Sequence, residues 1–441
     1  MRIGFAKVDI TPPLPSEQDR DLYLLGFWHE RAKPYDRIAD PLHARAVVFS
    51  DGKDLACLVA VDLIGDALGL GDDARVRIER SLGIPPERVM IACTHAHTTP
   101  ETIGLTQPPI SKRWRQSTVA RIEQAVAQAL HSLQEQQMFL LERRIPGLTV
   151  NRRAQRVSGH PEWAQLGHDA KSRAAAVDET LRLLRTGEKD NPAGIVANFG
   201  CHPVAVQTQP FISADFPGVL TRELEQHAET ALFTNSATGD LNPFRKEGWK
   251  DAEFTGKALA QEALVCLQHD HGVERETSPI RCAVEQLELP RRDLPPLEGL
   301  LDQKRELENQ LAAEPDSPVD APGHPGARLF RLNEVIALHS FPERLTAEIQ
   351  ALRIGSWIVV GIPGELFCCL GDDIRAAARN GKTWVIGYAN GYLGYIAPLD
   401  AHRLGGYEVS VARWSPLAPG AGETVRDRAV QLVRRLEASG L

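Results

Sequence analysis

Short apolar segments recur along the chain, and most are followed by a segment with helical periodicity. Segments of this length that are rich in Val, Ile, Leu and Ala are typical of buried strands. LACLVAV at residues 55–61 follows ARAVVF at residues 44–49 after a Ser-Asp-Gly-Lys turn, which predicts a hairpin. The predicted strands cover residues 44–49, 55–61, 88–93, 179–185, 193–199, 231–235, 281–289, 347–352, 356–362 and 383–388.

Helical periodicity occupies most of the intervals between these segments. The segment 118–134 is the clearest case, because Val119, Ile122, Val126 and Leu130 repeat at the spacing of one helix face. The other predicted helices cover residues 73–82, 217–229, 251–267, 366–378 and 424–438. Hairpin-like strand pairs combined with strand–helix alternation are typical of an α/β fold, in which mixed β-sheets are flanked by helices.

Residues 290–328 interrupt this alternation of strands and helices. A charged helix is expected over Leu300–Ala313, and it is followed by EPDSPVDAPGHPG, which is rich in Pro, Asp and Gly. We interpret the segment as a surface insertion with a mobile linker rather than as a domain boundary. Residues 1–441 are therefore expected to form a single domain, and we recognise no internal repeat in the sequence.

The charge balance and the apolar pattern limit the partners of the chain. A net charge of −8 argues against nucleic acid, and no apolar run reaches the roughly 18 residues of a membrane span. The N-terminus, MRIGFAKVDITPP, lacks the long apolar region of a secretory signal. The seven cysteines form no CxxC pair, so we expect free buried thiols and a cytoplasmic location.

The segment VMIACTHAHTT, residues 89–99, ends an apolar run in two histidines. If the predicted strand continues to His97, then His95 and His97 point to the same side of the sheet, because side chains alternate along a strand. Ligand sites of α/β sheets gather at the carboxyl ends of strands. The pair by itself is compatible with a metal site and also with histidines of a turn or core.

Three further apolar runs end close to possible metal ligands. His202 follows the run 195–199, Glu365 follows 357–362, and Tyr395 lies shortly after 384–388. Taken singly, each has a structural interpretation: a turn histidine, a carboxylate at a helix N-terminus and a buried tyrosine. Taken together, two imidazoles, a carboxylate and a phenol suit a divalent ion such as zinc. On spacing alone both interpretations stay open.

A series of short motifs resembles one known family. Through most of its length, and in the same order, the chain resembles the catalytic domain of the neutral, non-lysosomal ceramidases and their bacterial relatives. The resemblance implies a zinc amidase fold, and residues 290–328 have no counterpart in it that we can place. The motifs are GFAKVDITPP, ADPLHARAVVF, THAH, VNRR, AVDETLRLLR, NFGCHPVAV, TNSATGDLNP, VVGIPGELF and GYANGYLGYIAP followed by GGYE.

The resemblance also implies roles for individual residues. His97 falls on a histidine that transfers protons, and Arg152 falls on an arginine next to the substrate. Tyr407, twelve residues after Tyr395, falls on a tyrosine that assists the substrate carbonyl. The implied zinc ligands are His95, His202, Glu365 and Tyr395.

Two departures from the family pattern bear on function. The segment GDLNPF places Asn242 where ceramidases carry a required serine, and an amide can donate and accept hydrogen bonds but cannot serve as an alkoxide nucleophile. Either the residue at this position only positions other groups, or the reaction catalysed here differs from that of the ceramidases. The chain also ends soon after the region that resembles the catalytic domain, so we expect a homologue without the C-terminal β-sandwich domain.

Two other residues are weaker candidates for the site. Asp240 lies in the same segment as Asn242. It would orient a ligand histidine without itself binding the metal, or else it is a turn aspartate. His29, in GFWHER, has aromatic neighbours that suit a pocket wall and a role in substrate binding.

These observations predict a zinc-dependent hydrolase that cleaves the amide bond of an N-acyl substrate, ceramide-like or smaller, through metal-activated water. The expected partner is a small or lipid-like N-acyl compound, and the sequence says nothing about oligomeric state. Asn242 keeps a second function open, a metal-dependent esterase, lactonase or small-amide hydrolase that acts on a non-lipid substrate. A third is a non-catalytic homologue that binds the metal.

Overall fold

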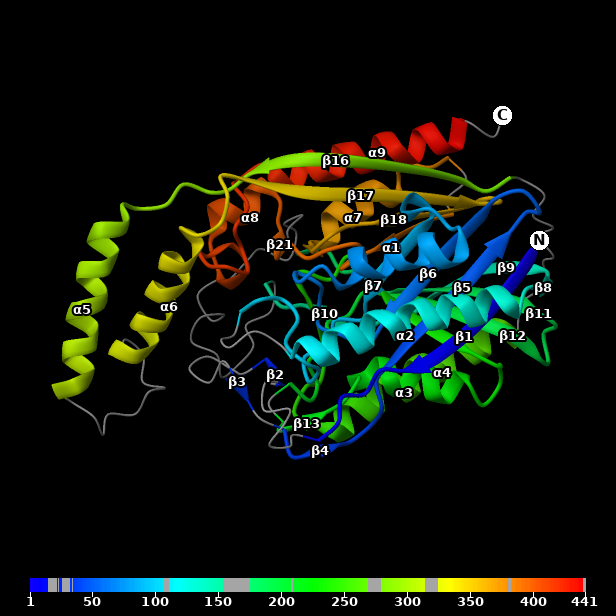
Figure 1. The fold of residues 1–441 in the computed structure, drawn as a ribbon, viewed down its shortest axis with the longest axis horizontal. Coiled ribbons are helices and arrows are strands. Elements are labelled where there is room, and N and C mark those ends of the chain that lie inside the picture. The colour runs from blue at the N-terminus through cyan, green and yellow to red at the C-terminus, as the bar shows by residue number, and fades with distance from the viewer. Residues whose placement is uncertain are drawn as a thin grey trace.

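Three β-sheets built on one plan form the framework of the molecule (Figure 1). The computed structural model describes residues 1–14, 22, 24–25, 32–33, 35–105, 111–153, 175–207, 209–268, 279–313, 324–379 and 382–438. In each sheet the first three strands pair antiparallel in sequence order. A helix then leads to a fourth strand, which lies parallel to the third.

A further helix follows the fourth strand of each unit. The first unit contains β1 (Arg2–Asp9), β5 (His43–Ser50), β6 (Leu55–Val61), α1 (Leu70–Leu82), β7 (Val89–Cys93) and α2 (Lys112–His131). The second contains β9 (Met138–Arg144), β11 (Thr180–Gly187), β12 (Pro192–Phe199), α3 (Asp215–Leu224), β14 (Ala231–Asn235) and α4 (Trp249–Gln268). The third contains β16 (Arg281–Pro290), β17 (Arg344–Ile354), β18 (Trp357–Gly361), α7 (Cys368–Arg375), β20 (Thr383–Ile386) and α9 (Ala421–Ala438).

Short strands and further helices lie outside these three units or extend them. β8 (Gln134–Glu135) extends the first sheet, and the other short strands pair in twos: β2 (Leu24–Leu25) with β3 (Ala32–Lys33), β4 (Arg37–Ile38) with β13 (Phe211–Ile212), β10 (Thr149–Asn151) with β15 (Leu241–Pro243), and β19 (Glu365–Leu366) with β21 (Tyr395–Ile396). The remaining helices are α5 (Leu297–Ala313), α6 (Pro325–Leu338), α8 (Leu399–Leu404) and 3-10 turns at Pro86–Arg88 and Tyr407–Val409.

The three sheets share one apolar core. Side chains from the inner faces of all three form a single buried cluster, for example Phe49, Leu184 and Trp357. The outer face of each sheet packs against its own helices: α1 and α2, α3 and α4, and α7 and α9. Both faces of a strand such as β6 are therefore covered, which explains its continuous apolar sequence, since alternate residues face the helices and the shared core.

The predicted α/β fold with mixed sheets and flanking helices is confirmed, and most elements lie within a few residues of their predicted ends. The hairpin of β5 and β6 forms as expected. α2 begins six residues earlier than predicted, because the Ser111 side chain accepts a hydrogen bond from the Trp114 N–H and caps the helix at residue 111. The threefold repetition of the sheet plan was not recognised in the sequence.

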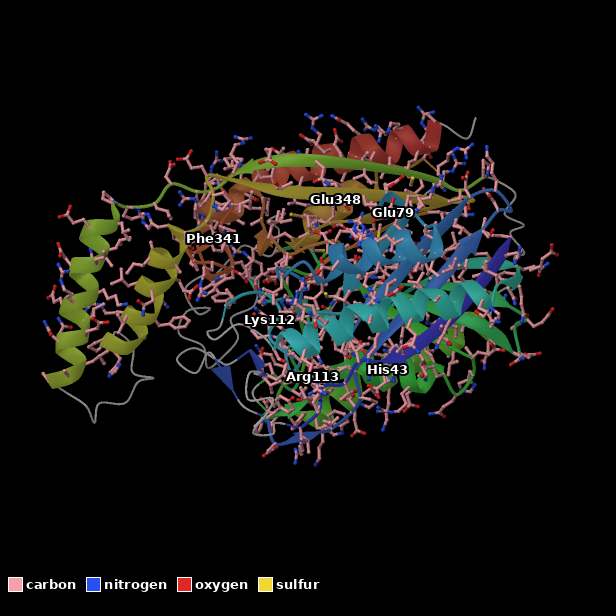
Figure 2. The ribbon with its side chains drawn as sticks, viewed as in Figure 1. His43, Glu79, Lys112, Arg113, Phe341 and Glu348 are labelled. Atoms are coloured by element: carbon pink, nitrogen blue, oxygen red, sulfur yellow. The ribbon has the colours of Figure 1, made fainter. Side chains whose placement is uncertain are left out.

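The segment around residues 290–328 forms a helical hairpin at one end of the molecule, away from both chain termini (Figure 1). α5 contains the predicted charged helix, but α6 was missed. Residues 324–326 were interpreted as part of a linker, yet His324 caps α6 and Pro325 begins it. Leu300, Leu307 and Leu332 pack the two helices together. Figure 2 shows Phe341 where the chain leaves the hairpin, and its side chain packs on the core of the third unit.

Two other features of the sequence analysis were the cysteines and the lack of a long apolar run. All seven cysteines lie in the described residues and are free thiols, five of them buried. No helix of the described part of the chain is both long and apolar enough to cross a membrane.

Candidate metal centre

The candidate ligands lie just beyond the carboxyl ends of strands from all three units. His95 follows β7, His202 follows β12, and Glu365 follows β18. Each of these strands belongs to a parallel pair, so the three sheets direct their carboxyl edges to one place. Tyr395 joins the group because β21 pairs with β19 and sets it opposite Glu365.

Three candidate ligand atoms meet at short distances. The Nε2 atoms of His95 and His202 are 3.0 Å apart. Glu365 Oε2 lies 3.1 Å from Nε2 of His202 and 3.6 Å from Nε2 of His95. Ligand atoms placed tetrahedrally at zinc's usual bond lengths are separated by about 3.3 Å, so these spacings fit a single zinc-sized ion.

Backbone carbonyls fix both imidazole rings. His95 Nδ1 donates to the Ile64 carbonyl at 2.5 Å, and His202 Nδ1 donates to the Thr238 carbonyl at 2.9 Å. A carbonyl oxygen only accepts, so Nδ1 carries the proton and Nε2 of a neutral ring presents a lone pair. Burial lowers the pKa of His95 well below its usual value and, together with the nearby Arg152 charge, lowers that of His202 to about 3. Both rings are therefore neutral, the form that binds metals.

Glu365 turns one oxygen toward these lone pairs. Its Oε1 accepts a hydrogen bond from the Tyr392 hydroxyl at 2.5 Å. Its Oε2 is buried and has no hydrogen-bond partner within the described residues. Two imidazole lone pairs and a carboxylate oxygen that face one another repel unless a cation lies between them. The residues present therefore fit a divalent metal ion.

The prediction that His95 and His97 share one face of an extended strand is wrong in its geometry. β7 ends at Cys93, and His95 has a φ of 68°, in the left-handed region. Its N–H donates to the Leu63 carbonyl, which holds this turn in place. The two rings still approach each other, with 3.2 Å between their Nε2 atoms.

His97 belongs to the same cluster but differs from the other two histidines. Its ring nitrogen lies with those of His95 and His202 in a group whose members are within 4.8 Å of one another. In the described part of the chain, however, no carbonyl or carboxylate accepts a hydrogen bond from its Nδ1. Burial, and then the charges of His202 and Arg152, lower its pKa well below the usual value. Its ring is therefore neutral.

Arg152 connects the centre with the surrounding residues. Its Nη2 donates to the Tyr395 hydroxyl at 2.9 Å and its Nη1 to Asn242 Oδ1 at 3.2 Å. Its Nε donates to Glu408 at 2.7 Å, and Glu408 also accepts from Arg153 at 2.6 Å. Although burial acts to raise the pKa of Glu408, these two arginines hold it below its usual value. The guanidinium of Arg152 is thus fixed on three sides.

Asn242 lies on β15, Asp240 directly precedes this strand, and Arg152 directly follows β10. β15 pairs with β10, which sets Asn242 opposite Val150. The Asp240 carboxylate accepts hydrogen bonds from the Asn151 amide at 2.7 Å and the Cys368 N–H at 2.8 Å. Carbonyls rather than Asp240 orient the histidine rings. Burial raises the pKa of Asp240 to about 7.

Tyr407 lies beside the proposed tyrosine ligand, since its ring centroid is 5.9 Å from that of Tyr395. His29, the predicted pocket residue, lies outside the described residues. The contacts given above therefore bring together eight of the predicted site residues: His95, His97, His202, Glu365, Tyr395, Arg152, Asn242 and Tyr407. Asp240 contacts Asn151, the residue before Arg152.

Three residues that surround the centre were not among the predicted site residues. Tyr392 bonds Glu365, Tyr388 stacks on the His95 ring with centroids 4.0 Å apart, and Glu408 fixes Arg152. Both tyrosines lie in GYANGYLGY, directly after β20. The clustering of three tyrosines after a buried strand was the available signal.

Known proteins resemble this chain in sequence and in fold. A family model described as "Neutral/alkaline non-lysosomal ceramidase, N-terminal" matches residues 1–277. The fold resembles that in "Crystal Structure Analysis of neutral ceramidase from Pseudomonas aeruginosa", with a TM-score of 0.72 and 18% identity over 99% of this chain and 74% of that chain. It also resembles "Ceramidase complexed with C2", with a TM-score of 0.72 and 16% identity over 99% and 75% of the two chains. No curated protein matches.

Proposed function

The chain belongs to the neutral/alkaline non-lysosomal ceramidase family, a family of hydrolases that act on an amide C–N bond, and on that premise we propose that it is a zinc-dependent hydrolase of N-acyl amides. One observation carries the metal part of the proposal. The lone pairs of His95 and His202 face the Glu365 oxygen that has no hydrogen-bond partner within the described residues. A zinc ion is the natural occupant of a site with these donors.

The ligands in this proposal are His95, His202, Glu365 and the Tyr395 hydroxyl. A zinc ion held there would lower the pKa of a bound water from about 16 to about 7 and polarise the substrate carbonyl. Burial raises the pKa of Tyr395 well above its usual value, while the Arg152 charge beside the hydroxyl acts in the opposite direction. The charge of Arg152 therefore favours the phenolate, the form of the Tyr395 side chain that binds a cation.

His97 is the proposed proton carrier. Its neutral ring lies 3.2 Å from that of His95, yet its Nδ1 lacks the carbonyl partner that fixes each of the other two rings within the described residues. A ring without that restraint is free to take a proton from water and deliver it to the leaving amine. Metal-binding histidines are usually fixed through their second nitrogen, which favours proton transfer by His97 over a role as a fifth ligand.

Tyr407, Arg152 and Asn242 are the proposed substrate contacts. The Tyr407 hydroxyl would donate to the oxyanion that develops on the amide carbonyl, a role whose loss typically costs about 3–4 kcal/mol of barrier. Arg152 only donates, so the Asn242 atom it contacts is the amide oxygen and the NH₂ group points elsewhere. This fixed NH₂ donor would hold the substrate.

A second candidate function is hydrolysis of an ester or lactone. Asn242 supports it, because the position that carries the required serine of ceramidases has no nucleophilic oxygen here. With water as the only nucleophile, a carbonyl with a better leaving group than an amine is a reasonable substrate.

The decisive experiment measures chelator-sensitive turnover on matched substrates. Protein purified without a histidine tag is assayed with N-acyl amines of short and long acyl chain and with the corresponding esters. We expect amide hydrolysis that a chelator abolishes and zinc restores. Turnover that survives complete removal of metal would contradict the proposal, and hydrolysis of the esters alone would select the second candidate.

A further inference from the structure

Helix α6 of the helical hairpin is held against the core by a buried ion pair. Arg413 donates from Nη2 to Glu334 Oε1 at 2.8 Å and from Nε to Oε2 at 3.1 Å, a two-pronged arrangement. The Glu334 side chain is 2% exposed and that of Arg413 is 16% exposed. A paired contact of this kind fixes the orientation as well as the distance of the two groups.

The same guanidinium reaches the segment that carries two of the site histidines. Arg413 Nη1 donates to the Gly104 carbonyl at 3.2 Å, and Nη2 donates to the Leu105 carbonyl at 3.0 Å. These carbonyls end the described segment that leaves β7 and contains His95 and His97. The Arg413 side chain thus links its own segment to α6 and to residues 104–105.

The next residue, Trp414, supports both site tyrosines. Its carbonyl accepts a hydrogen bond from the Tyr395 N–H at 2.8 Å, and its indole N–H donates to the Tyr407 carbonyl at 3.3 Å. Its ring stacks on Tyr407 with centroids 5.1 Å apart. A Cβ on Gly394 would lie 2.2 Å from the Trp414 carbonyl oxygen, which shows how closely the two segments approach.

Helix α6 also contacts this aromatic stack. The Phe330 ring stacks on Trp414 with centroids 6.2 Å apart and planes inclined by 26°. The rings of Phe330, Trp414, Tyr407 and Tyr395 therefore form a continuous series from α6 to the metal centre. In Figure 1, α6 lies next to the region of α8 and β21, in agreement with these contacts.

We propose that Glu334 and Phe330 of α6 are positioning residues of the active site, which place Tyr395 and Tyr407 through the Arg413–Trp414 segment. Tyr407 lies in a single 3-10 turn, and Tyr395 begins a strand of only two residues. Elements this short do not hold a side chain to the roughly 0.5 Å that catalysis requires, so support from a packed helix is needed. The α5–α6 hairpin then has a role in positioning the site.

This inference rests on the proposed function, and two readouts test it. Glu334→Gln keeps the size of the side chain and removes the charge that orients Arg413, and Phe330→Leu keeps an apolar side chain and removes the ring. Glu308→Gln, which breaks an exposed pair with Lys304 on α5, is the matched control. Each protein is loaded with cobalt(II), whose visible absorption reports the positions of its ligands, and each zinc form is assayed for kcat and KM.

We expect Glu334→Gln and Phe330→Leu to bind cobalt stoichiometrically with a shifted visible spectrum and to lose about 10–100-fold in kcat with little change in KM, because small displacements near the reacting groups cost this much. Glu308→Gln should match the wild type in both. Spectra and kcat values of both α6 variants that match the wild type would overturn the inference. If the wild type proves inactive on amides, the proposed function fails, while the cobalt spectra still decide whether α6 positions the centre.

Discussion

Glu365 Oε2 lies 3.1 Å from His202 Nε2, and this imidazole nitrogen carries no proton to donate to the carboxylate. The His202 ring donates from Nδ1 to the Thr238 carbonyl, and its pKa of about 3 leaves Nε2 as a lone pair at neutral pH. The contact is therefore not an ordinary ion pair. Two electron-rich atoms are held together by strands from different sheets, and a cation between them would turn repulsion into binding.

Replacing His202 or Glu365 by glutamine should remove most of the bound zinc. Each substitution removes a ligand, so affinity should fall by more than the roughly 10–100-fold seen when only the orientation of a ligand is lost. His97→Gln should keep stoichiometric zinc and lose activity, because His97 is assigned to proton transfer. Metal analysis after gel filtration measures both effects. Equal zinc in His202→Gln and the wild type would disprove the ligand set, and loss of zinc in His97→Gln would make His97 a ligand.

Tyr392→Phe should weaken zinc binding about 10–100-fold, because it removes the hydroxyl that holds Glu365 Oε1 and so aims Oε2 at the centre. Competition with a chromogenic chelator measures this affinity. Tyr35→Phe is the matched control, since it removes a tyrosine hydroxyl that donates to the Pro13 carbonyl at 2.7 Å. If both variants bind zinc as tightly as the wild type, the Tyr392 hydroxyl has no part in orienting the ligand.

Asn242→Ser tests whether asparagine in place of the ceramidase serine changed the chemistry. If water is the nucleophile, the serine variant gains no covalent step and should turn over no faster than the wild type. Asn242→Ala should lose about 10–100-fold in kcat/KM, because one hydrogen bond to the charged Arg152 is worth about 1.5–3 kcal/mol. Stopped-flow assays give the rates. A burst of product and faster turnover in the serine variant would show that the position is a disabled nucleophile site.

The parts of the fold that could be predicted from the sequence are those fixed by local pattern. Strands such as β6 and β14 appeared with correct ends, because both of their faces are buried and their sequences are continuously apolar. His95, His202 and Glu365 were found for the same reason, since each follows such a strand. Their meeting follows from the convergence of three sheets, which no local pattern encodes.

What escaped prediction depends on contacts between residues distant in sequence. The left-handed turn at His95 is held by the Leu63 carbonyl. The Tyr392 hydroxyl meets a carboxylate 27 positions away. Helix α6 was missed because its first turn was assigned to a linker rich in Pro and Gly, although Pro is favoured at the first position of a helix. The common plan of the sheets leaves no sequence repeat, because packing tolerates many apolar residues at each position.

Glu408→Gln should destabilise the folded protein by about 3–5 kcal/mol, because it leaves the buried guanidinium groups of Arg152 and Arg153 without their shared countercharge. Urea unfolding of the metal-free protein measures the change. Glu179→Gln provides the comparison, since its partner Arg144 is 77% exposed and such pairs contribute about 0–1 kcal/mol. Similar small losses in the two variants would mean that the buried network contributes little stability.

Asp40 should make the protein less stable as the pH rises. Burial raises its pKa to about 7, against the lowering effect of hydrogen bonds from Ser213 and from the Ala214 N–H, which is 3.0 Å from Oδ1. Between its ordinary pKa of 3.8 and 7, the folded state holds a proton that the unfolded state releases. Unfolding free energy therefore falls across this window, by up to about 4 kcal/mol from this group, and levels off above it.

The variant Asp40→Asn removes this titration and isolates its effect. Urea unfolding of the metal-free protein at intervals from pH 4 to pH 8 should show the variant gaining stability relative to the wild type as the pH rises, with the largest gain near pH 8. Asp190→Asn, at an exposed position, should follow the wild type throughout. A constant difference between Asp40→Asn and the wild type would mean that Asp40 is ionised in the folded protein over the whole range, so its burial would have to be compensated by its hydrogen bonds.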